Sequence, residues 1–545
     1  MRNQLRKKMG GFFSENDDIF QNILSRLPAL SFASAACVNK SWYNGCGRIL
    51  SRPKLVSALS CNPSLHLAVR EVVDKVLLEP IWPHFAIAFI GTQFNLQAAH
   101  QLITERLGSR TPTVTSAVCG IIGMDACTDE LREVKWDFVY PGGPNGMGLN
   151  AVEDLDYGIV LAVGFFPGLK FDVIPLLRPK GECQGAMVDK FVMDIREYAT
   201  TVSGTKDPAG IILFGDQRVD VKAVIAELDY AMPKETVIVG DTNGCFLWNS
   251  VDNSQNYWGD QYNFDIVGLV FARDKNKSQD IGEIQFHVAM STGIIPFGPE
   301  LRVVSVEDRG AKYSWFTAKM EGGNGTLDAQ GLLDDVVEQV EDHLHNLYVG
   351  VVKERESSSG SENLELRKYR VFHEVLGGED GGFVVDGHGI EPNDSFLFYH
   401  TDSETAKCSC FNAYKNLGHL KEALSLKNHD GGGGAETSEV FGCVSFSCYR
   451  SGERFFGHPK VLTYPFWKNF PGTPLIGAYC LEEIGRETEQ LVSQKDEGAE
   501  SKAIEAMGEK YDDEEECSVR CPMHVYSSVY LLMSYIPPGS PPLEF

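Results

Sequence analysis

The chain has 545 residues, which is too long for a single hydrophobic core and predicts two to four domains. A hydrophobic content of 43% is typical of a folded globular protein and excludes a disordered one. The 75 acidic residues outnumber the 49 basic ones, and the resulting net charge of -26 argues against a general binder of nucleic acid or of anionic membranes.

Targeting and membrane signals are also weak. Four basic residues lie among the first eight, but no apolar run follows them, so we expect no secretory signal peptide. The apolar runs at 85–90, 158–166 and 211–214 have the length of strands and fall short of the roughly 20 residues that span a membrane. Fourteen unevenly spaced cysteines indicate reduced thiols. We therefore expect a soluble intracellular protein of the cytoplasm, the nucleus or both.

The first predicted elements are three short helices within residues 17–43, "DDIFQNILSRLPALSFASAACVNKSWY". Ser14 or Asn16 can cap the first helix, Pro28 ends it, and Ser31 can cap the second. About 40 residues cannot bury so many apolar groups among themselves, so the surplus must contact the rest of the chain or another protein. From pattern alone, a helical cap on the body is the favoured alternative. The apolar face of the first helix comprises Ile19, Phe20, Ile23, Leu24 and Leu27; Val38, Trp42 and Tyr43 fall on the third helix.

The remainder alternates strand and helix patterns. "HFAIAFIG" predicts a strand, "NLQAAHQLITERLG" a helix that ends at Gly108, and "TPTVTSAVCGIIG" a strand. Strands at 264–274 and 283–299 follow each other without a helix, which indicates a mixed sheet. The fold class we expect is therefore α/β, of the mixed α+β kind. Segments 353–364, 427–439 and 494–520 read as linkers or insertions.

A resemblance identifies the first segment. "ILSRLPALSFASAACVNKSWY" resembles the F-box through Leu27, Pro28, Val38, Lys40 and Trp42. The resemblance implies an F-box at residues 14–60 that buries its apolar face on the SKP-type adaptor of a cullin-based (SCF) ubiquitin ligase. The adaptor-binding residues that it implies are Ile19, Ile23, Leu24, Leu27, Pro28, Leu30, Val38 and Trp42.

A second resemblance covers most of the rest. "VFGCVSFSCYRSGERFFG" and "FPGTPLIGAYCLEEIG" resemble the C-terminal FIST domain, and "TSAVCGIIG" and "YGIVLAVGFFPGLKFDVIPLL" are similar to its N-terminal half. "STGIIPFGPELRVVSV" fits the family's Ser-x-Gly-x-x-Pro-x-Gly element. The resemblance implies FIST halves at 80–350 and 365–536, each a mixed sheet flanked by helices, with an acidic insertion at about 490–522. The candidate ligand or substrate pocket is Ser291, Gly293, Pro296, Gly298, Cys448, Arg450, Gly452, Gly477 and Glu483.

No sequence motif of common catalytic sites is present, so we expect no catalytic residue. GxxxxGK[ST], HExxH and GxSxG are all missing. Arg450 and Arg454 can lower the pKa of Cys448 and favour a thiolate nucleophile, but an inert buried thiol is the more common case. Adjacent Glu482 and Glu483 would point to opposite faces of a strand, which leaves Glu483 as the pocket candidate.

Other candidate sites have plainer interpretations. Residues 291–298 can present N–H groups to an anion, but a tight turn explains them as well. His343 and His345 have a poor metal spacing, and "YDDEEE" reads as a solvated loop. Neither Cys408 with Cys410 nor the pair at 517 and 521 has the paired CxxC spacing of structural zinc, so we expect no metal and no cofactor.

Three hypotheses follow. In the first, the chain is a substrate receptor: the F-box docks on the adaptor and cullin assembly, and the FIST body recruits an unidentified target protein for ubiquitination. In the second, the FIST body is a sensor whose small-molecule ligand controls partner binding. In the third, the chain is an enzyme with Cys448 as nucleophile, which ranks lowest because no His–acid pair accompanies it.

Overall fold

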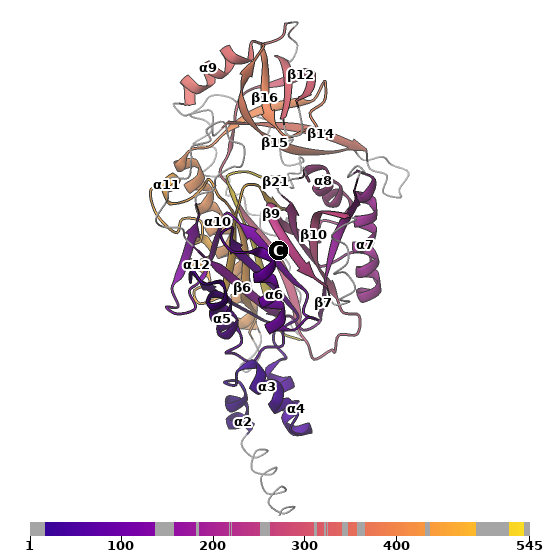
Figure 1. Cartoon of the computed structure of the whole chain (residues 1–545), viewed down its shortest axis with the longest axis vertical. Coiled ribbons are helices and arrows are strands. Elements are labelled where there is room, and N and C mark those ends of the chain that lie inside the picture. Colours follow the sequence, from indigo (N-terminus) through magenta and orange to yellow (C-terminus); the bar gives the residue numbers. More distant parts are fainter. Residues whose placement is uncertain are drawn as a thin grey trace, which may run out of the picture.

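The computed structural model describes residues 17–136, 157–180, 185–216, 219, 221–250, 262–309, 313–320, 323, 325–340, 347–356, 366–430, 437–486 and 523–538. The predicted acidic insertion, "YDDEEE", His343, His345 and the cysteines at 517 and 521 lie outside them. Figure 1 shows three tiers: small helices at one end, a layered body in the middle and a barrel at the other end.

The body contains a ten-stranded mixed sheet. Two neighbouring pairs, β2 with β3 and β8 with β9, are parallel, while the other neighbouring pairs of the described strands are antiparallel. Two short strands, β20 (Glu483–Gly485) and β21 (Met523–His524), attach to it through β9. The main path runs β1 (Lys54–Ser60), β6 (Ile159–Phe165), β2 (Phe85–Gly91), β3 (Thr113–Val118), β9 (Val237–Asn249), β8 (Gly210–Asp216), β10 (Tyr262–Arg273) and β7 (Leu169–Pro179).

A six-stranded sheet faces the first one. Its strands come from both predicted FIST halves, and β20 and β21 carry later residues into the ten-stranded sheet, so the expected halves share both sheets rather than forming one each. Its order is β11 (Glu283–Thr292), β22 (Ser527–Ile536), β18 (Glu439–Cys448), β19 (Leu475–Cys480), β4 (Gly120–Met124) and β5 (Leu131–Lys135).

Side chains along each strand point alternately to the two faces of the sheet. Each sheet therefore packs against the other sheet on one face and against helices on the other, which gives the body four layers. In β2, for example, Phe85, Ile87 and Phe89 enter the core between the sheets, whereas the alternate residues face the outer helices. Helices cover the outer face of each sheet. The ten-stranded sheet carries α5 (Leu65–Val76), α6 (Leu96–Leu107), α7 (Gly185–Ser203) and α8 (Lys222–Ala231); the six-stranded sheet carries α10 (Ser403–Asp430), α11 (Glu453–Phe456) and α12 (Tyr464–Asn469).

The third tier is a closed six-stranded barrel. Phe316, Phe383 and Phe396 fill its interior, and α9 (Ala329–Val340) packs on it. The predicted division at 350–365 falls inside this barrel, because β14 and β15 pair directly; the charged linker therefore joins two neighbouring strands instead of two domains. The barrel order is β12 (Ile295–Arg309), β13 (Tyr313–Met320), β16 (Gly382–Asp386), β15 (Leu366–Glu379), β14 (Leu347–Glu356) and β17 (Ser395–His400).

Most predicted elements are confirmed, including the helix that ends at Gly108. Two predicted strands are each divided. "TPTVTSAVCGIIG" forms β3 in one sheet and β4 in the other, with Cys119 between them, and 283–299 is split between β11 in the body and β12 in the barrel. Among the described residues, no helix is long and apolar enough to cross a membrane.

Candidate functional site

The N-terminal unit consists of α2 (Asp17–Leu24), α3 (Ala29–Ala36) and α4 (Lys40–Ile49). Pro28, and not the predicted Ser31, occupies the N-cap of α3, because its fixed φ suits entry into a helix. Asn39 caps α4: its side-chain oxygen accepts a hydrogen bond from the Trp42 N–H at 3.0 Å. The three predicted helices are therefore confirmed, with one cap corrected.

A small core holds these helices together. Phe20 and Leu24 of α2 pack with buried residues of α3 and α4, and the Phe20 and Trp42 rings meet edge to face at 5.1 Å. Gly45 makes this contact possible, since a Cβ there would lie 2.5 Å from the Phe20 ring. The unit joins the body where the Ala29 N–H donates to the Leu77 carbonyl. The core residues are Phe20, Leu24, Phe32, Ala35 and Cys46.

The same helices leave large apolar side chains in solvent. Their exposed fractions run from 45% for Ile23 to 79% for Leu30, and in Figure 1 the helices project from the body. Several large apolar side chains exposed on so small a unit indicate an interaction surface. We call this set the docking face: Ile19, Ile23, Leu30, Val38 and Tyr43.

The structure sorts the eight predicted adaptor-binding residues into three groups. Ile19, Ile23, Pro28, Leu30 and Val38 are exposed, as a docking surface requires. Leu27 and Trp42 are half-buried against the small core, and Leu24 is fully buried inside it. Leu24 thus holds the helices together and is not on the docking face. Tyr43, 66% exposed, was left out of the prediction although its place beside Trp42 on the third helix was visible in the sequence.

In the body, Cys448 is buried at the end of β18. Burial and the negative charge of Glu483 raise the pKa of this thiol to about 12, and they outweigh the opposing effect of Arg450. The hypothesis that arginines activate Cys448 is therefore wrong in direction. A protonated, enclosed thiol is a poor nucleophile.

Glu483 is completely buried on β20, between β9 and β21. Its Oε2 accepts a hydrogen bond from the Ser527 Oγ at 2.8 Å, while its Oε1 has no partner among the described residues. Burial, together with the nearby charges of Asp241 and Glu482, raises the pKa of Glu483 well above its ordinary value. Its surroundings thus favour the protonated, neutral form of the carboxyl over the carboxylate.

Arg450 links the body to the barrel. Its guanidinium donates to both carboxylate oxygens of Glu374 on β15, at 2.9 and 2.7 Å, and also to the hydroxyl of Tyr348 on β14. Tyr348 and Cys448 lie in one buried cluster at this junction. Arg450 is therefore engaged in an ion pair that joins the body to the barrel.

The other predicted pocket residues shape the backbone. Gly293 donates to the Tyr526 carbonyl at 3.0 Å, and Ser291 pairs with Ser528 in register. Gly298 has a φ of +72°, which favours glycine. A Cβ at Gly477 would lie 2.3 Å from the Ser445 Oγ, and one at Gly452 would lie 2.5 Å from the Lys135 Nζ. These two glycines permit close packing, while Pro296 is exposed on β12.

Several predicted residues nevertheless meet at one place, the turn that joins β21 to β22. Gly293, Ser291 and Glu483 contact residues 526–528, and the Cys448 thiol has a hydrogen bond with the Tyr526 backbone. Tyr526 itself has a φ of +50°. They form a buried junction between the sheets and the barrel.

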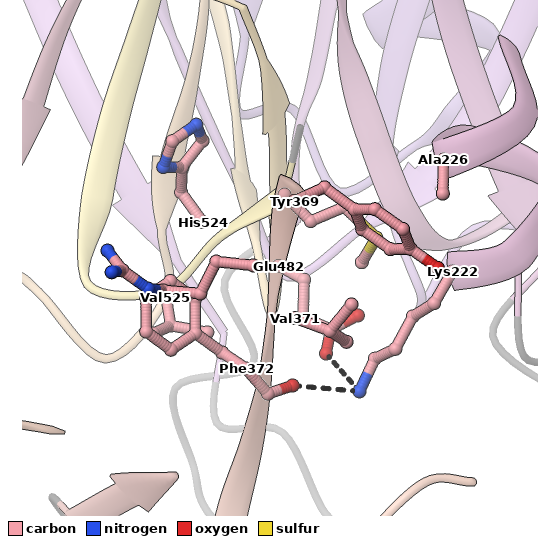
Figure 2. Close-up of a pocket in the computed structure, with 10 residues that line it drawn as sticks. Lys222, Ala226, Tyr369, Val371, Phe372, Glu482, His524 and Val525 are labelled. Carbon is pink, nitrogen blue, oxygen red and sulfur yellow. Dashed lines mark hydrogen bonds and ion pairs between the residues drawn. The ribbon is translucent and has the colours of Figure 1, made fainter. Parts of the chain in front are cut away.

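A small, open pocket lies beside this junction. Figure 2 shows Lys222 of α8 reaching the Glu482 carboxylate at 3.4 Å and the Phe372 carbonyl at 3.1 Å. His524 and Tyr369 also line it. Glu482 and Glu483 thus point to different surroundings, as predicted, but Glu482 is the one that faces the pocket. No sequence pattern indicates Lys222 as a pocket residue, because it is far from Glu482 along the chain.

Neither site contains a recognisable metal centre: among the described residues, no group of three or more His, Cys, Asp or Glu is placed to hold an ion. Cys408 is exposed on α10 while Cys410 is buried beneath it.

Comparison with known proteins agrees with the N-terminal geometry. The F-box domain family matches residues 16–49, which contain all three helices and the docking face. An F-box/LRR-repeat protein of Arabidopsis thaliana is 38% identical over 534 residues, which cover 95% of this chain and 93% of that protein. The described residues form a sandwich and a barrel rather than a leucine-rich-repeat solenoid. With an F-box at its N-terminus and a full-length F-box relative, the chain belongs to the F-box protein family.

Proposed function

We propose that this chain is the substrate-recognition subunit of an SCF-type cullin-RING ubiquitin ligase. The docking face carries the proposal: large apolar side chains stay in solvent on helices that already have a core of their own. Burying them on an SKP-type adaptor would contribute about 25 cal/mol for each Å² of apolar area removed from water. The cullin then joins through the adaptor, and catalysis belongs to partner subunits.

The body would recruit the target protein. Its proposed identity is a pair of FIST halves, which the quoted motifs support, without the boundary at 350–365, which falls inside the barrel. Their strands interleave in two sheets, so the pair would act as one rigid platform. The Arg450–Glu374 ion pair ties the barrel to this platform.

Complex formation with the adaptor tests the proposal. Full-length chain and adaptor are co-expressed and passed through a size-exclusion column, beside the variant Ile23→Asp with Leu30→Asp. We expect a 1:1 complex that the double variant loses, because two charges would be buried in the interface. Met193→Asp is the matched control, since Met193 is 67% exposed on α7. A complex that survives the double variant would refute the docking face.

These positions are better choices than Leu27 and Pro28. Leu27 packs on the small core, and Pro28 starts α3, so their replacement would disturb the helices as well as the surface. If the Leu27 and Pro28 variant did not bind the adaptor, misfolded helices alone could explain the result.

A ligand-gated receptor is the second candidate, and the pocket in Figure 2 favours it. Lys222 offers a cation to a small anionic ligand that displaces Glu482. A thermal-shift screen of amino acids and dicarboxylates would detect binding as increased stability. Lys222→Met should abolish any shift; a shift that persists in this variant would place the ligand elsewhere.

A further inference from the structure

A row of aromatic side chains is exposed where α10 meets α12. Phe411 and Tyr464 are 53% and 50% exposed, and Tyr414 lies between them. The Phe411 and Tyr414 rings stack at 5.9 Å, and the Tyr414 and Tyr464 rings meet at 5.7 Å. Two helices distant in sequence thus build one continuous apolar strip.

The strip is held rigid from below. Ala413, Leu417 and Phe466 anchor the two helices in the core against the six-stranded sheet. Asn469 fastens them together, because its Nδ2 donates to the Tyr414 carbonyl and to the Pro465 carbonyl, each at 2.9 Å. A preformed surface loses little entropy on binding.

Positive charge surrounds the strip. The Lys415 Nζ lies 5.1 Å from the Phe411 ring centre, and Lys460 and Lys468 stand four residues before and after Tyr464. Within the described part of the chain, no ion pair involves any of these three lysines. We call the six residues the α10–α12 face: Phe411, Tyr414, Lys415, Lys460, Tyr464 and Lys468.

The two chain segments that form the face are themselves poor in negative charge, which is unusual for this protein, although the Glu133 carboxylate lies beside them and accepts a hydrogen bond from the Thr463 Oγ1 at 2.7 Å. Residues 405–421 and 454–481 contain no Asp or Glu, although about one residue in seven is acidic overall. The segments carry Lys407, Lys415, Lys421, Arg454, Lys460 and Lys468. Because the net charge of -26 repels anions at long range, this basic region attracts an anionic partner only at short range. The anionic groups of a binding partner must therefore contact the face directly.

We infer that the α10–α12 face binds an acidic peptide segment, containing an aromatic side chain, of a partner protein. The aromatic side chain stacks on the strip of rings, and carboxylates pair with Lys415, Lys460 and Lys468. This inference rests on the proposed function, to which it adds the class of target segment and the place where it binds.

Stacked aromatics with lysines also suit single-stranded nucleic acid, but the charge favours a peptide. A nucleic-acid groove follows a phosphate backbone with many cations and overcomes repulsion from the rest of the protein. Here three lysines border one short strip, and the chain as a whole is strongly acidic.

Fluorescence anisotropy with the full-length chain tests the inference. The probe is a labelled peptide of about 12 residues, three repeats of Asp-Glu-Tyr-Glu. We expect binding that weakens from about 50 to about 300 mM salt. Replacement of Tyr by Ser in the peptide, and Phe411→Ala with Tyr464→Ala in the protein, should each weaken binding about tenfold or more. Lys415→Glu with Lys468→Glu should abolish it.

Matched controls locate the effect. Trp82→Ala removes another exposed aromatic residue and Lys190→Glu inverts another helical lysine, and both should bind normally. Equal binding of a Lys-Lys-Tyr-Lys peptide, or tighter binding of a single-stranded oligonucleotide, would overturn the inference. So would binding that appears only when the acidic residues at 512–516 are neutralised, since the chain's own segment would then be the occupant.

Adaptor binding separates this inference from the proposed function. Every variant of the α10–α12 face should still form the complex with the adaptor, because the face lies outside the N-terminal helices. A chain that binds the adaptor but not the acidic peptide keeps its ligase role and loses only this surface.

Discussion

The N-terminal helices leave large apolar side chains in water, whereas the body encloses thiols and carboxyl groups at the junction of its sheets and barrel. Ile23 and Leu30 belong to the first kind, and Cys448 and Glu483 to the second. Exposed large apolar residues and a fully buried carboxyl such as Glu483 reverse the usual distribution, whereas a buried thiol such as Cys448 follows it. The comparison separates two kinds of residue. An exposed apolar residue indicates a surface that binds a partner, whereas burial that keeps a titratable group in its neutral form lowers its reactivity.

Thiol reactivity is where the two regions should differ most. Native full-length protein is treated with iodoacetamide at neutral pH, and labelling of Cys37 and Cys448 is followed by peptide mass spectrometry. A rise in its pKa from 9.0 to about 12 lowers the thiolate fraction of Cys448 about 1000-fold at neutral pH, and the thiol is also enclosed, so Cys448 should react far more slowly than exposed Cys37. Denatured protein, labelled equally at both, is the control. Rapid native labelling of Cys448 would revive the nucleophile hypothesis.

Two adjacent residues sharpen the comparison inside the N-terminal unit. Leu24→Ala removes a fully buried side chain and should cost the helices about 2–5 kcal/mol of stability, whereas Ile23→Ala should change stability by less than about 0.5 kcal/mol. Hydrogen exchange of the α2–α4 amides in the full chain measures both. Equal losses at the two positions would contradict the division between core and docking face.

The buried carboxyl predicts a pH dependence. Because the folded pKa of Glu483 is raised, the folded state keeps a proton that the unfolded chain has lost. Its stabilisation is complete below about pH 4.5 and is lost as the pH rises towards the folded pKa. Relative to Glu483→Gln, wild-type stability should therefore fall with pH by up to about 1.4 kcal/mol per unit. Denaturant unfolding at a series of pH values measures it, and parallel curves would refute the raised pKa.

The link between tiers should give the smallest effect. Glu374→Gln removes the charge that pairs with Arg450, and because Arg450 is one-third exposed we expect a loss of only about 1 kcal/mol. A double-mutant cycle with Arg450→Lys isolates the pair from other contacts of each residue. Additive losses would mean that the ion pair contributes nothing to the barrel's attachment.

Local pattern predicted most helices and strands because their apolar periodicity survives in the fold. It could not predict which sheet a strand joins. Cys119, between β3 and β4, leads the chain from one sheet to the other without any turn signal, and the linker at 357–365 joins paired strands although its composition resembles a domain boundary. Such features depend on pairing between distant segments.

Site prediction had the same limit. Apolar spacing placed Leu24 and Ile23 on one wide face, but only packing shows that Leu24 belongs to the interior. Arg450 and Cys448 are close in sequence, which suggested that the arginine activates the thiol. Arg450 instead forms an ion pair with Glu374, which lies 76 residues from it along the chain. Lys222 could not be predicted as a pocket residue either, because it meets Glu482 only through contacts between distant segments.

Hydrogen exchange of the full-length chain with and without the SKP-type adaptor tests the central claim most directly. The account predicts that the adaptor slows exchange at residues 17–43, around Ile19, Ile23, Leu30 and Val38, and leaves the sandwich and barrel unchanged. Slower exchange confined to the body, or no change with the adaptor in excess, would contradict the assignment of the docking face.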